Sequence, residues 1–262
     1  MKKLFVALSF LSICTFAIAH TIEWYVGDNL LSTTTCNSSD NITPPTAPAK
    51  YGYTFDKWEL PYTRLEYIES TGTQYIDTRI VPISGYTVIS EFSLSFISSD
   101  GSCVHFGARD AGLSSGNGLV AGRQSNSRSV TASYFGSFYT NNSMNFSVNV
   151  VNKYEFKPTM FYVYKNNSIF TGSSWPSSTN GVNNTTLYLG ALHDGNTVEL
   201  SKDSIRFISF KIKNESGILI LDLIPVKLDM DGKLGMYDTV SGQFFTNAGT
   251  GEFIAGPEIG GL

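Results

Sequence analysis

Residues Tyr86 to Phe96 read YTVISEFSLSF, and apolar side chains recur at every second position of this segment. Successive side chains of a β-strand point to opposite faces, so this period of two gathers one set of residues on the same side. That set is mainly apolar and consists of Tyr86, Val88, Ser90, Phe92, Leu94 and Phe96. The segment therefore predicts a strand with one face in a core and the other face mostly in water.

The same period recurs toward the C-terminus, at Phe146 to Val150, Met160 to Tyr164, Leu187 to Leu189 and Ile205 to Ile212. Asn166-Asn167 and the segment from Asn214 to Gly217 predict hairpin turns, because Asn and Gly tolerate positive φ. Ile218 to Pro225 is more continuously apolar, which predicts a strand buried on both faces. We find no long segment with apolar residues at helical spacing. The chain is therefore predicted to be all-β, with two packed antiparallel sheets.

Both ends of this region resemble the laminin-G/concanavalin-A-like domain of gut-bacterial and phage-associated proteins. The resemblance rests on YTRLEYIESTGTQYIDT at 62–78, IPV at 224–226, DGKLGMYD at 231–238 and FFTNAGTG at 244–251. It implies a jelly-roll β-sandwich over residues 60–257, followed by a tail at 258–262. We expect the sandwich to close by pairing of Arg64 to Ser70 with Phe253-Ile254. The jelly-roll fold hosts lectins, adhesion modules, glucanases and structural domains, so it does not identify a ligand.

Residues 20–59 form a second, smaller unit. IEWY at 22–25, TTC at 34–36, PTAP at 45–48 and GYTF at 52–55, with a following Trp58, resemble the internalin-type B repeat, a β-grasp-like module of bacterial surface proteins. Trp24, Tyr53, Phe55 and Trp58 are interpreted as its miniature core, because so small a unit needs its aromatic residues for burial. Only one copy of the repeat is present.

The first 19 residues have the features of a secretory signal peptide. Two lysines precede an apolar stretch that is too short to span a bilayer and that ends in Ala17-Ile18-Ala19. We place cleavage after Ala19 and expect a secreted or cell-surface protein. The competing interpretation is a lipoprotein signal with Cys14 as the acylated residue, against which bulky Ile13 argues. No transmembrane segment is predicted after residue 20.

The charge of the chain argues against one class of partner, and the positions of its cysteines argue against a disulfide. Loss of Lys2 and Lys3 with the signal takes the net charge from -4 to -6. Because binding to nucleic acid needs clustered Lys and Arg, we expect no nucleic-acid partner. Cys36 and Cys103 fall in different predicted units and are expected to be free thiols.

We predict that the chain is not an enzyme. Glycoside hydrolysis needs two opposed carboxylates, and the glucanases of this fold carry Glu-x-Asp-x-x-Glu or a close variant on one strand, which is missing here. Glu66 and Glu69 are three residues apart, so on a strand they would point to opposite faces. The histidines are His20, His105 and His193, and we interpret His105 as structural and His193 as part of a loop.

No cofactor is required by this interpretation, and calcium is the one that the sequence suggests. Asp229-Met230-Asp231-Gly232 offers two carboxylates, and calcium prefers several oxygen ligands. Asp-Gly is also a common turn signal, and we favour the turn.

Candidate ligand contacts lie in polar loops. Trp175, within TGSSWPSSTNG at 171–181, is either a plug over the sandwich or a platform for a sugar ring, and we favour the plug. A second aromatic group surrounds Gly136, with basic and acidic residues as polar companions: Tyr134, Phe138, Tyr139, Arg109, Asp110 and Arg123.

The sequence is therefore interpreted as a secreted, non-catalytic binding module for a glycan or a surface protein. The alternative is a structural domain that assembles with surface or phage-associated chains. A glycoside hydrolase is the third and least favoured interpretation. The oligomeric state is left open.

Overall fold

The computed structural model describes residues 8–10, 19–26, 29–37, 45–46, 49, 51, 62–99, 101–110, 118–124, 129–175 and 183–259. These residues form β-strands, turns and irregular segments, and no helix occurs among them. Among the described strands, all pairs are antiparallel except that of β16 with β8. The prediction of an all-β, antiparallel β-sandwich is confirmed.

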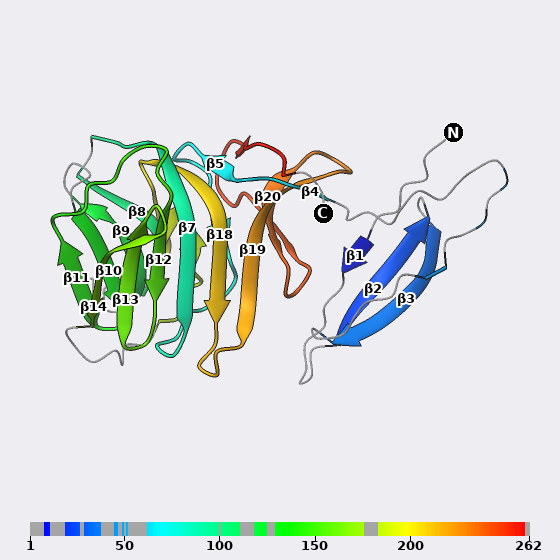
Figure 1. Ribbon diagram of the computed structural model, residues 1–262, viewed down its shortest axis with the longest axis horizontal. Coiled ribbons are helices and arrows are strands. Elements are labelled where there is room, and N and C mark those ends of the chain that lie inside the picture. Colours follow the sequence, from blue (N-terminus) through cyan, green and yellow to red (C-terminus); the bar gives the residue numbers. More distant parts are fainter. Residues whose placement is uncertain are drawn as a thin grey trace.

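Two sheets form the sandwich, and the larger one faces the viewer in Figure 1. In spatial order it contains β14 (Ser168–Ser174), β13 (Met160–Lys165), β12 (Asn152–Phe156), β7 (Thr87–Phe96), β18 (Ser204–Lys213), β19 (Leu219–Leu228), β20 (Leu234–Asp238) and β21 (Phe244–Thr246). Three short strands extend it, namely β4 (Tyr62–Arg64) on β19, β5 (Ile68–Ser70) on β18 and β22 (Ile254–Ala255) on β5.

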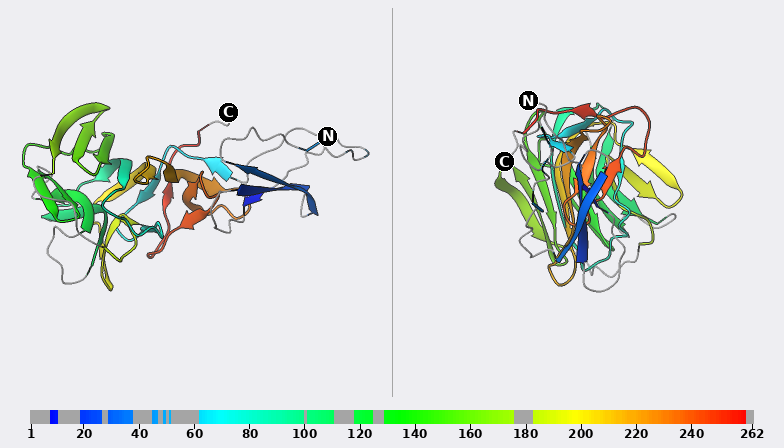
Figure 2. Two further views of the ribbon diagram at one scale, coloured as in Figure 1. Left: turned by 90° about the horizontal axis from the view of Figure 1, so that it is seen from below. Right: turned by 90° about the vertical axis from the view of Figure 1, so that its right-hand side faces the viewer.

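The smaller sheet lies behind the larger one, as the views in Figure 2 show. Its order is β11 (Ser137–Asn141), β10 (Ser129–Tyr134), β9 (Gly118–Gln124), β8 (Ser102–Arg109), β15 (Tyr188–Leu189) and β6 (Ile76–Asp77). A hairpin of β16 (Ala191–Asp194) and β17 (Thr197–Leu200) joins β8 through β16. The inner faces of both sheets supply one apolar core.

Strand β7 behaves as its alternation predicts. Val88, Phe92 and Leu94 are buried, and the neighbours on the other face are mostly half-buried. Phe96, at the end of the strand, is exposed. The turn predictions are also confirmed, since Asn166 and Asn167 adopt φ of 47° and 61° and Gly217 adopts 77°.

Two strand predictions were wrong. No strand forms at Phe146 to Val150, where a single parallel bridge joins Val148 to Leu94 and Phe146 reaches the core from an irregular segment. Ile218 to Pro225 is not buried on both faces, because Leu221 and Leu223 point inward while Ile218 is exposed. The sequence of β19 is almost continuously apolar because its outer face also carries apolar residues.

The predicted closure of the sandwich is observed. Ile254 of β22 pairs with Glu69 of β5, and Leu65 forms a bridge with Glu258. The C-terminal segment thus lies beside the first strands of the sandwich, which ties the two ends of this unit together. Among the described residues, no helix has the length and apolar character needed to cross a bilayer.

A separate three-stranded sheet precedes the sandwich. It contains β1 (Leu8–Phe10), β2 (Ala19–Val26) and β3 (Asn29–Asn37) in that order. Trp24 is buried, and its Nε1–H donates a 2.9 Å hydrogen bond to Oγ1 of Thr34. Strand β1 belongs to the predicted signal peptide, so cleavage after Ala19 would remove it. The other residues of the predicted miniature core, Tyr53, Phe55 and Trp58, lie outside the described residues.

Candidate functional site

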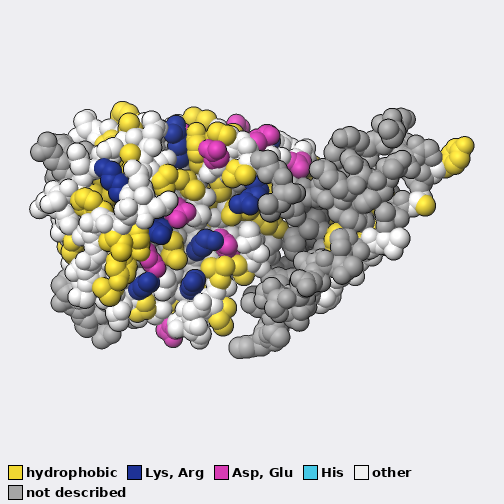
Figure 3. Space-filling view, viewed as in Figure 1, with side chains coloured by type: hydrophobic (Ala, Val, Ile, Leu, Met, Phe, Trp, Pro, Cys, Tyr) yellow, Lys and Arg dark blue, Asp and Glu magenta, His cyan; other side chains and the backbone are white. Residues whose placement is uncertain are grey.

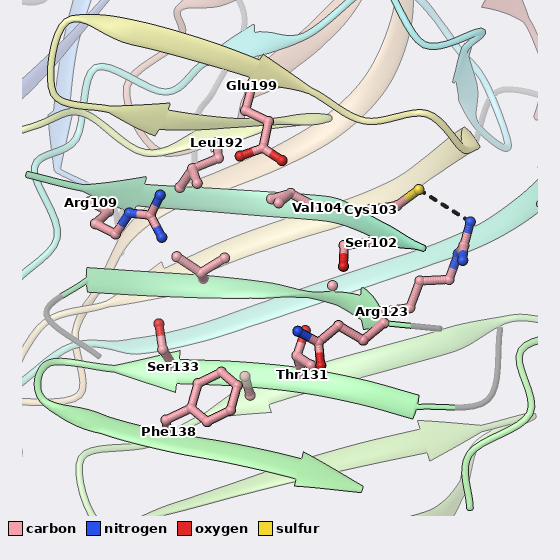
Figure 4. A pocket seen from close by; sticks show the side chains of 14 residues that line it. Ser102, Cys103, Val104, Arg109, Arg123, Thr131, Ser133, Phe138, Leu192 and Glu199 are labelled. Carbon is pink, nitrogen blue, oxygen red and sulfur yellow. Dashed lines mark hydrogen bonds between the residues drawn. The ribbon is translucent and has the colours of Figure 1, made fainter. Parts of the chain in front are cut away.

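A groove crosses the outer face of the smaller sheet, over β8, β9, β10 and β11 (Figure 4). The β16–β17 hairpin forms one wall of this groove and Phe138 of β11 forms the other. Its volume of about 170 Å³ is below the roughly 300–1,000 Å³ of pockets for drug-sized ligands. The lining residues are Ser102, Cys103, Val104, Arg109, Val120, Gly122, Arg123, Gln124, Thr131, Ala132, Ser133, Phe138, Leu192 and Glu199.

Strand alternation sorts these residues into the floor and the layer beneath it. On β9, Leu119 and Ala121 are fully buried in the core, and Val120 and Gln124 point outward into the groove. On β10, Val130, Ala132 and Tyr134 face the core, so Thr131 and Ser133 belong to the groove side, where Thr131 is half-buried and the buried Ser133 hydroxyl donates to the carbonyl oxygen of Gly118. The floor therefore carries both polar side chains and the valines Val104 and Val120 over an apolar layer.

A β-bulge in β8 shapes the middle of the floor. The pairing register between β8 and β9 shifts between Val104 and Phe106, which leaves His105 as the extra residue. The bulge lets both His105 and Phe106 point into the core. Opposite it, a Cβ on Gly122 would lie 2.2 Å from the carbonyl oxygen of Cys103, so only glycine fits between the two strands.

Phe138 is the one residue of the predicted aromatic group that faces the groove. Its side chain is 44% exposed. The neighbouring Tyr139 points to the opposite face, where it packs on the core and its hydroxyl lies 3.2 Å from Oγ1 of Thr171. Tyr134 is fully buried, and its hydroxyl donates to the carbonyl oxygens of Ser84 and Tyr86. Tyr134 and Tyr139 are therefore not available to a ligand, because adjacent strand residues face opposite sides.

Arg109 and Glu199 supply charge at the groove. The Nε and Nη2 groups of Arg109 donate hydrogen bonds of 3.2 and 2.6 Å to the two carboxylate oxygens of Asp194. This paired hydrogen bonding to Asp194 raises the pKa of Arg109 above its ordinary value. Glu199 lies on β17 and its side chain extends toward β8 (Figure 4). No ion pair engages Glu199 within the part of the chain that the structure describes.

Arg123 lies beneath the groove and not in it. Its guanidinium is fully buried and donates to both carboxylate oxygens of Asp203, at 2.7 and 2.6 Å. Nε2 of His105 lies 3.3 Å from the same carboxylate, and the backbone N–H of Ser98 donates to it at 2.8 Å. The prediction that Arg123 contacts a ligand is corrected here, because a buried charge of this kind needs its partners to compensate for lost hydration.

Asp203 is the acceptor at the centre of this buried network. Burial alone would raise the pKa of its carboxyl, but hydrogen bonds from His105 and Arg123 outweigh burial and hold the pKa well below its ordinary value. Nδ1 of His105 lies 2.9 Å from the hydroxyl of Tyr154, which is fully buried. His105 is thus enclosed by structural partners, as the sequence predicts.

Cys103 belongs to the same network. It is a free cysteine, as expected, and its side chain is buried. Burial, with a further contribution from the Asp203 charge, raises the pKa of its thiol to about 11. The thiol is therefore protonated at neutral pH. The side chain of Cys36 lies outside the described residues.

Trp175 lies in the core and has the arrangement expected of a plug. Its ring stacks on Tyr134, Phe156 and Phe161 with centroid distances of 5.2, 5.6 and 5.0 Å. Its Nε1–H donates to the carbonyl oxygen of Lys157 at 2.8 Å. Only 8% of the residue is exposed, so it offers no ring face to a sugar.

The remaining predicted polar residues have local partners. Asp110 follows β8 and accepts hydrogen bonds from the backbone N–H and the side-chain amide of Asn184. Asp229 accepts from Oγ1 of Thr63, and Asp231 accepts from the backbone N–H of Lys233 within a turn. Gly232 has φ of 71° there, as the turn interpretation requires. The described residues contain no cluster of three or more His, Cys, Asp or Glu side chains suited to a metal ion.

The opposite outer face of the sandwich has a different character. Figure 3 shows basic, acidic and apolar side chains interspersed over the larger sheet. Its charges pair with one another, as in the 2.7 Å contact of Arg206 with Glu69 and the 3.0 Å contact of Lys211 with Asp222. These partly exposed ion pairs belong to a solvated surface, where each pair contributes little to stability.

Sequence reasoning placed Phe138 and Arg109 at a site but missed Glu199, Leu192 and the polar floor. The floor has a signal in the sequence, because Thr131 and Ser133 alternate with the apolar residues of β10. The same parity places Arg123 with Leu119 and Ala121, which indicates that it points inward. Glu199 has no comparable signal, because its position depends on the pairing of β16 with β8 across the fold.

Comparison with known proteins identifies no family and no curated relative of this chain. Among solved structures, it is similar to domains LG4-5 of the mouse laminin alpha1 chain, with 11% sequence identity and a TM-score of 0.40. The match covers 74% of this chain and 52% of the laminin chain, so it spans about half of that chain.

Proposed function

We propose that this chain is a secreted, non-catalytic binding module whose groove on the smaller sheet holds a saccharide. The observation that carries the proposal is the composition of the groove. An exposed aromatic ring, Phe138, stands beside a floor on which hydroxyl and amide groups lie next to Val104 and Val120. The apolar C–H face of a sugar ring packs on such an aromatic ring, while sugar hydroxyls need nearby polar partners.

Two features support binding without catalysis. Glu199 is the only carboxylate among the lining residues, whereas glycoside hydrolysis needs an opposed pair. His105 of β8 is buried, and its ring nitrogens are occupied by Tyr154 and Asp203. The groove is also small, which fits a weak, reversible contact with part of a sugar chain better than enclosure of a whole substrate.

Export supports the same proposal. The apolar N-terminal segment and its small-residue ending are typical of a signal peptide, and extracellular glycans would be the accessible ligands. The single B-repeat-like unit at residues 20–59 would then link the sandwich to its surroundings. No calcium is needed in this proposal, because Asp229 and Asp231 are occupied by protein partners.

Substitution of Phe138 by alanine tests the proposal. We expect Phe138→Ala to weaken glycan retention at least about tenfold, since the stacking surface is lost. The measurement is affinity electrophoresis through polysaccharide-containing gels, after a glycan array has identified a retained polymer. Melting temperature should change little, because Phe138 lies on the outer face of the sheet and 44% of it is exposed.

Phe96→Ala is the matched control. Phe96 is 56% exposed at the end of β7 in the larger sheet, so its loss removes similar surface away from the groove. It should leave retention unchanged. Equal loss of retention in both variants, or none in Phe138→Ala, would show that the groove is not the binding site.

A further inference from the structure

The charges at the groove do not balance. Of the three charged lining residues, Arg109 is paired with Asp194 and Arg123 is paired with Asp203. Glu199 remains without an ion-pair partner among the described residues and lies near enough to Arg109 to influence its ionisation. Counted together with Asp194 and Asp203, the described lining residues therefore carry a net negative charge.

We propose that the groove binds uncharged saccharides and rejects those that carry carboxylate or sulfate groups, and that Glu199 sets this preference. The inference rests on the proposed function and adds the ligand class. It assigns Glu199 as a specificity-determining residue, which neither the fold nor the aromatic wall indicates.

The preference follows from the surroundings of the two arginines. An acidic sugar would have to compete with Asp194 for Arg109, whose Nε and Nη2 groups already bond both carboxylate oxygens. Arg123 is not accessible, because its side chain is fully buried and held by Asp203. Among the described lining residues both guanidinium groups are already paired with carboxylates, so an acidic group in the groove would meet the Glu199 charge without an unpaired cation beside it.

Glu199 favours binding of an uncharged sugar and disfavours binding of an acidic one. Its hydroxyl groups can donate to the Glu199 carboxylate, and a hydrogen bond to a charged acceptor is stronger than one between neutral groups. Ser102, Thr131 and Gln124 at the groove add neutral partners, since their side chains both donate and accept hydrogen bonds. The same position thus attracts hydroxyls and repels anions.

The experiment compares glycan classes in wild type and in Glu199→Gln. An array carrying neutral, uronate-bearing and sulfated glycans is probed at low ionic strength, where surface charge is least screened. We expect wild type to retain neutral glycans, with acidic ones at least tenfold weaker. Glu199→Gln keeps an acceptor oxygen without the charge, and it should raise the ratio of acidic to neutral binding at least fivefold.

Glu66→Gln is the control, because Glu66 is an exposed carboxylate on a different part of the sandwich. It should leave the ratio unchanged, and both variants should melt like wild type. Preferential wild-type binding of acidic glycans would overturn the inference, as would an unchanged ratio in Glu199→Gln. If Phe138→Ala still abolishes binding in that case, the proposed function stands. If wild type retains no glycan of any charge, the proposed function fails as well.

Discussion

Asp203→Ala is expected to destabilise the protein by about 3–5 kcal/mol, because it leaves the buried Arg123 charge without its partner. Both side chains of this ion pair are fully buried, and His105 and Ser98 also donate to the lost carboxylate. Urea unfolding followed by circular dichroism measures the loss. A variant that carries Arg123→Met together with Asp203→Leu should recover part of it, since removing both charges leaves no unpaired ion.

Glu258→Ala is the control for this prediction. Glu258 pairs with Lys227 at the surface, where 59% of the glutamate side chain is exposed. Loss of such a pair should cost less than about 1 kcal/mol. If Asp203→Ala destabilises the protein no more than Glu258→Ala does, the buried network does not hold the fold in the way described here.

The same carboxyl predicts a pH dependence. The pKa of Asp203 is lower in the folded protein than the value of about 3.9 in an unfolded chain. Its contribution is thus fully present above the unfolded pKa and is lost as the pH falls through the folded one. Wild type should lose stability below about pH 4, and Asp203→Ala should lose less over the same interval.

Trp175→Ala is expected to cost about 3–5 kcal/mol, which is typical for removal of a large buried aromatic side chain. The substitution opens a cavity among Tyr134, Phe156 and Phe161, and it leaves the Lys157 carbonyl without its donor. Thermal unfolding measures the effect. Below its own melting temperature the variant should retain glycans like wild type, because Trp175 lies inside the sandwich.

Phe170→Ala is the control for Trp175. Phe170 is 40% exposed on β14, the neighbouring strand segment, and its loss should hardly change the melting temperature. A Trp175→Ala variant with wild-type melting temperature but no glycan retention would contradict the core placement and would support the sugar platform instead.

The fold was largely predictable from the sequence because its signals are local. Alternation in β7, β13 and β18 reports which face of each strand is buried, and the Asn and Gly turns report where strands end. The errors have a shared cause. At Phe146 and at Ile218 to Pro225, the apolar residues have the spacing of a buried strand. Pairing with other strands decides whether such a strand forms and which of its faces is buried.

The site was less predictable because it depends on contacts between distant segments. Asp203 lies 80 residues from Arg123 in the sequence. The residues near Arg123 therefore do not indicate that a carboxylate neutralises its charge. Because of the bulge at His105, the residues that follow it in β8 point to the opposite faces from those that simple alternation predicts. Trp175 and Tyr134 were grouped as ligand candidates because aromatic residues near glycine occur both in cores and at binding sites.

Backbone amide NMR can locate the binding surface residue by residue. The protein is labelled with ¹⁵N and titrated with an uncharged oligosaccharide from the retained polymer. Chemical-shift changes should centre on β8 to β11 and on the β16–β17 hairpin, with Phe138 and Glu199 among the most affected. Changes centred on the outer face of β12, β13 and β18 would contradict the assignment of the groove.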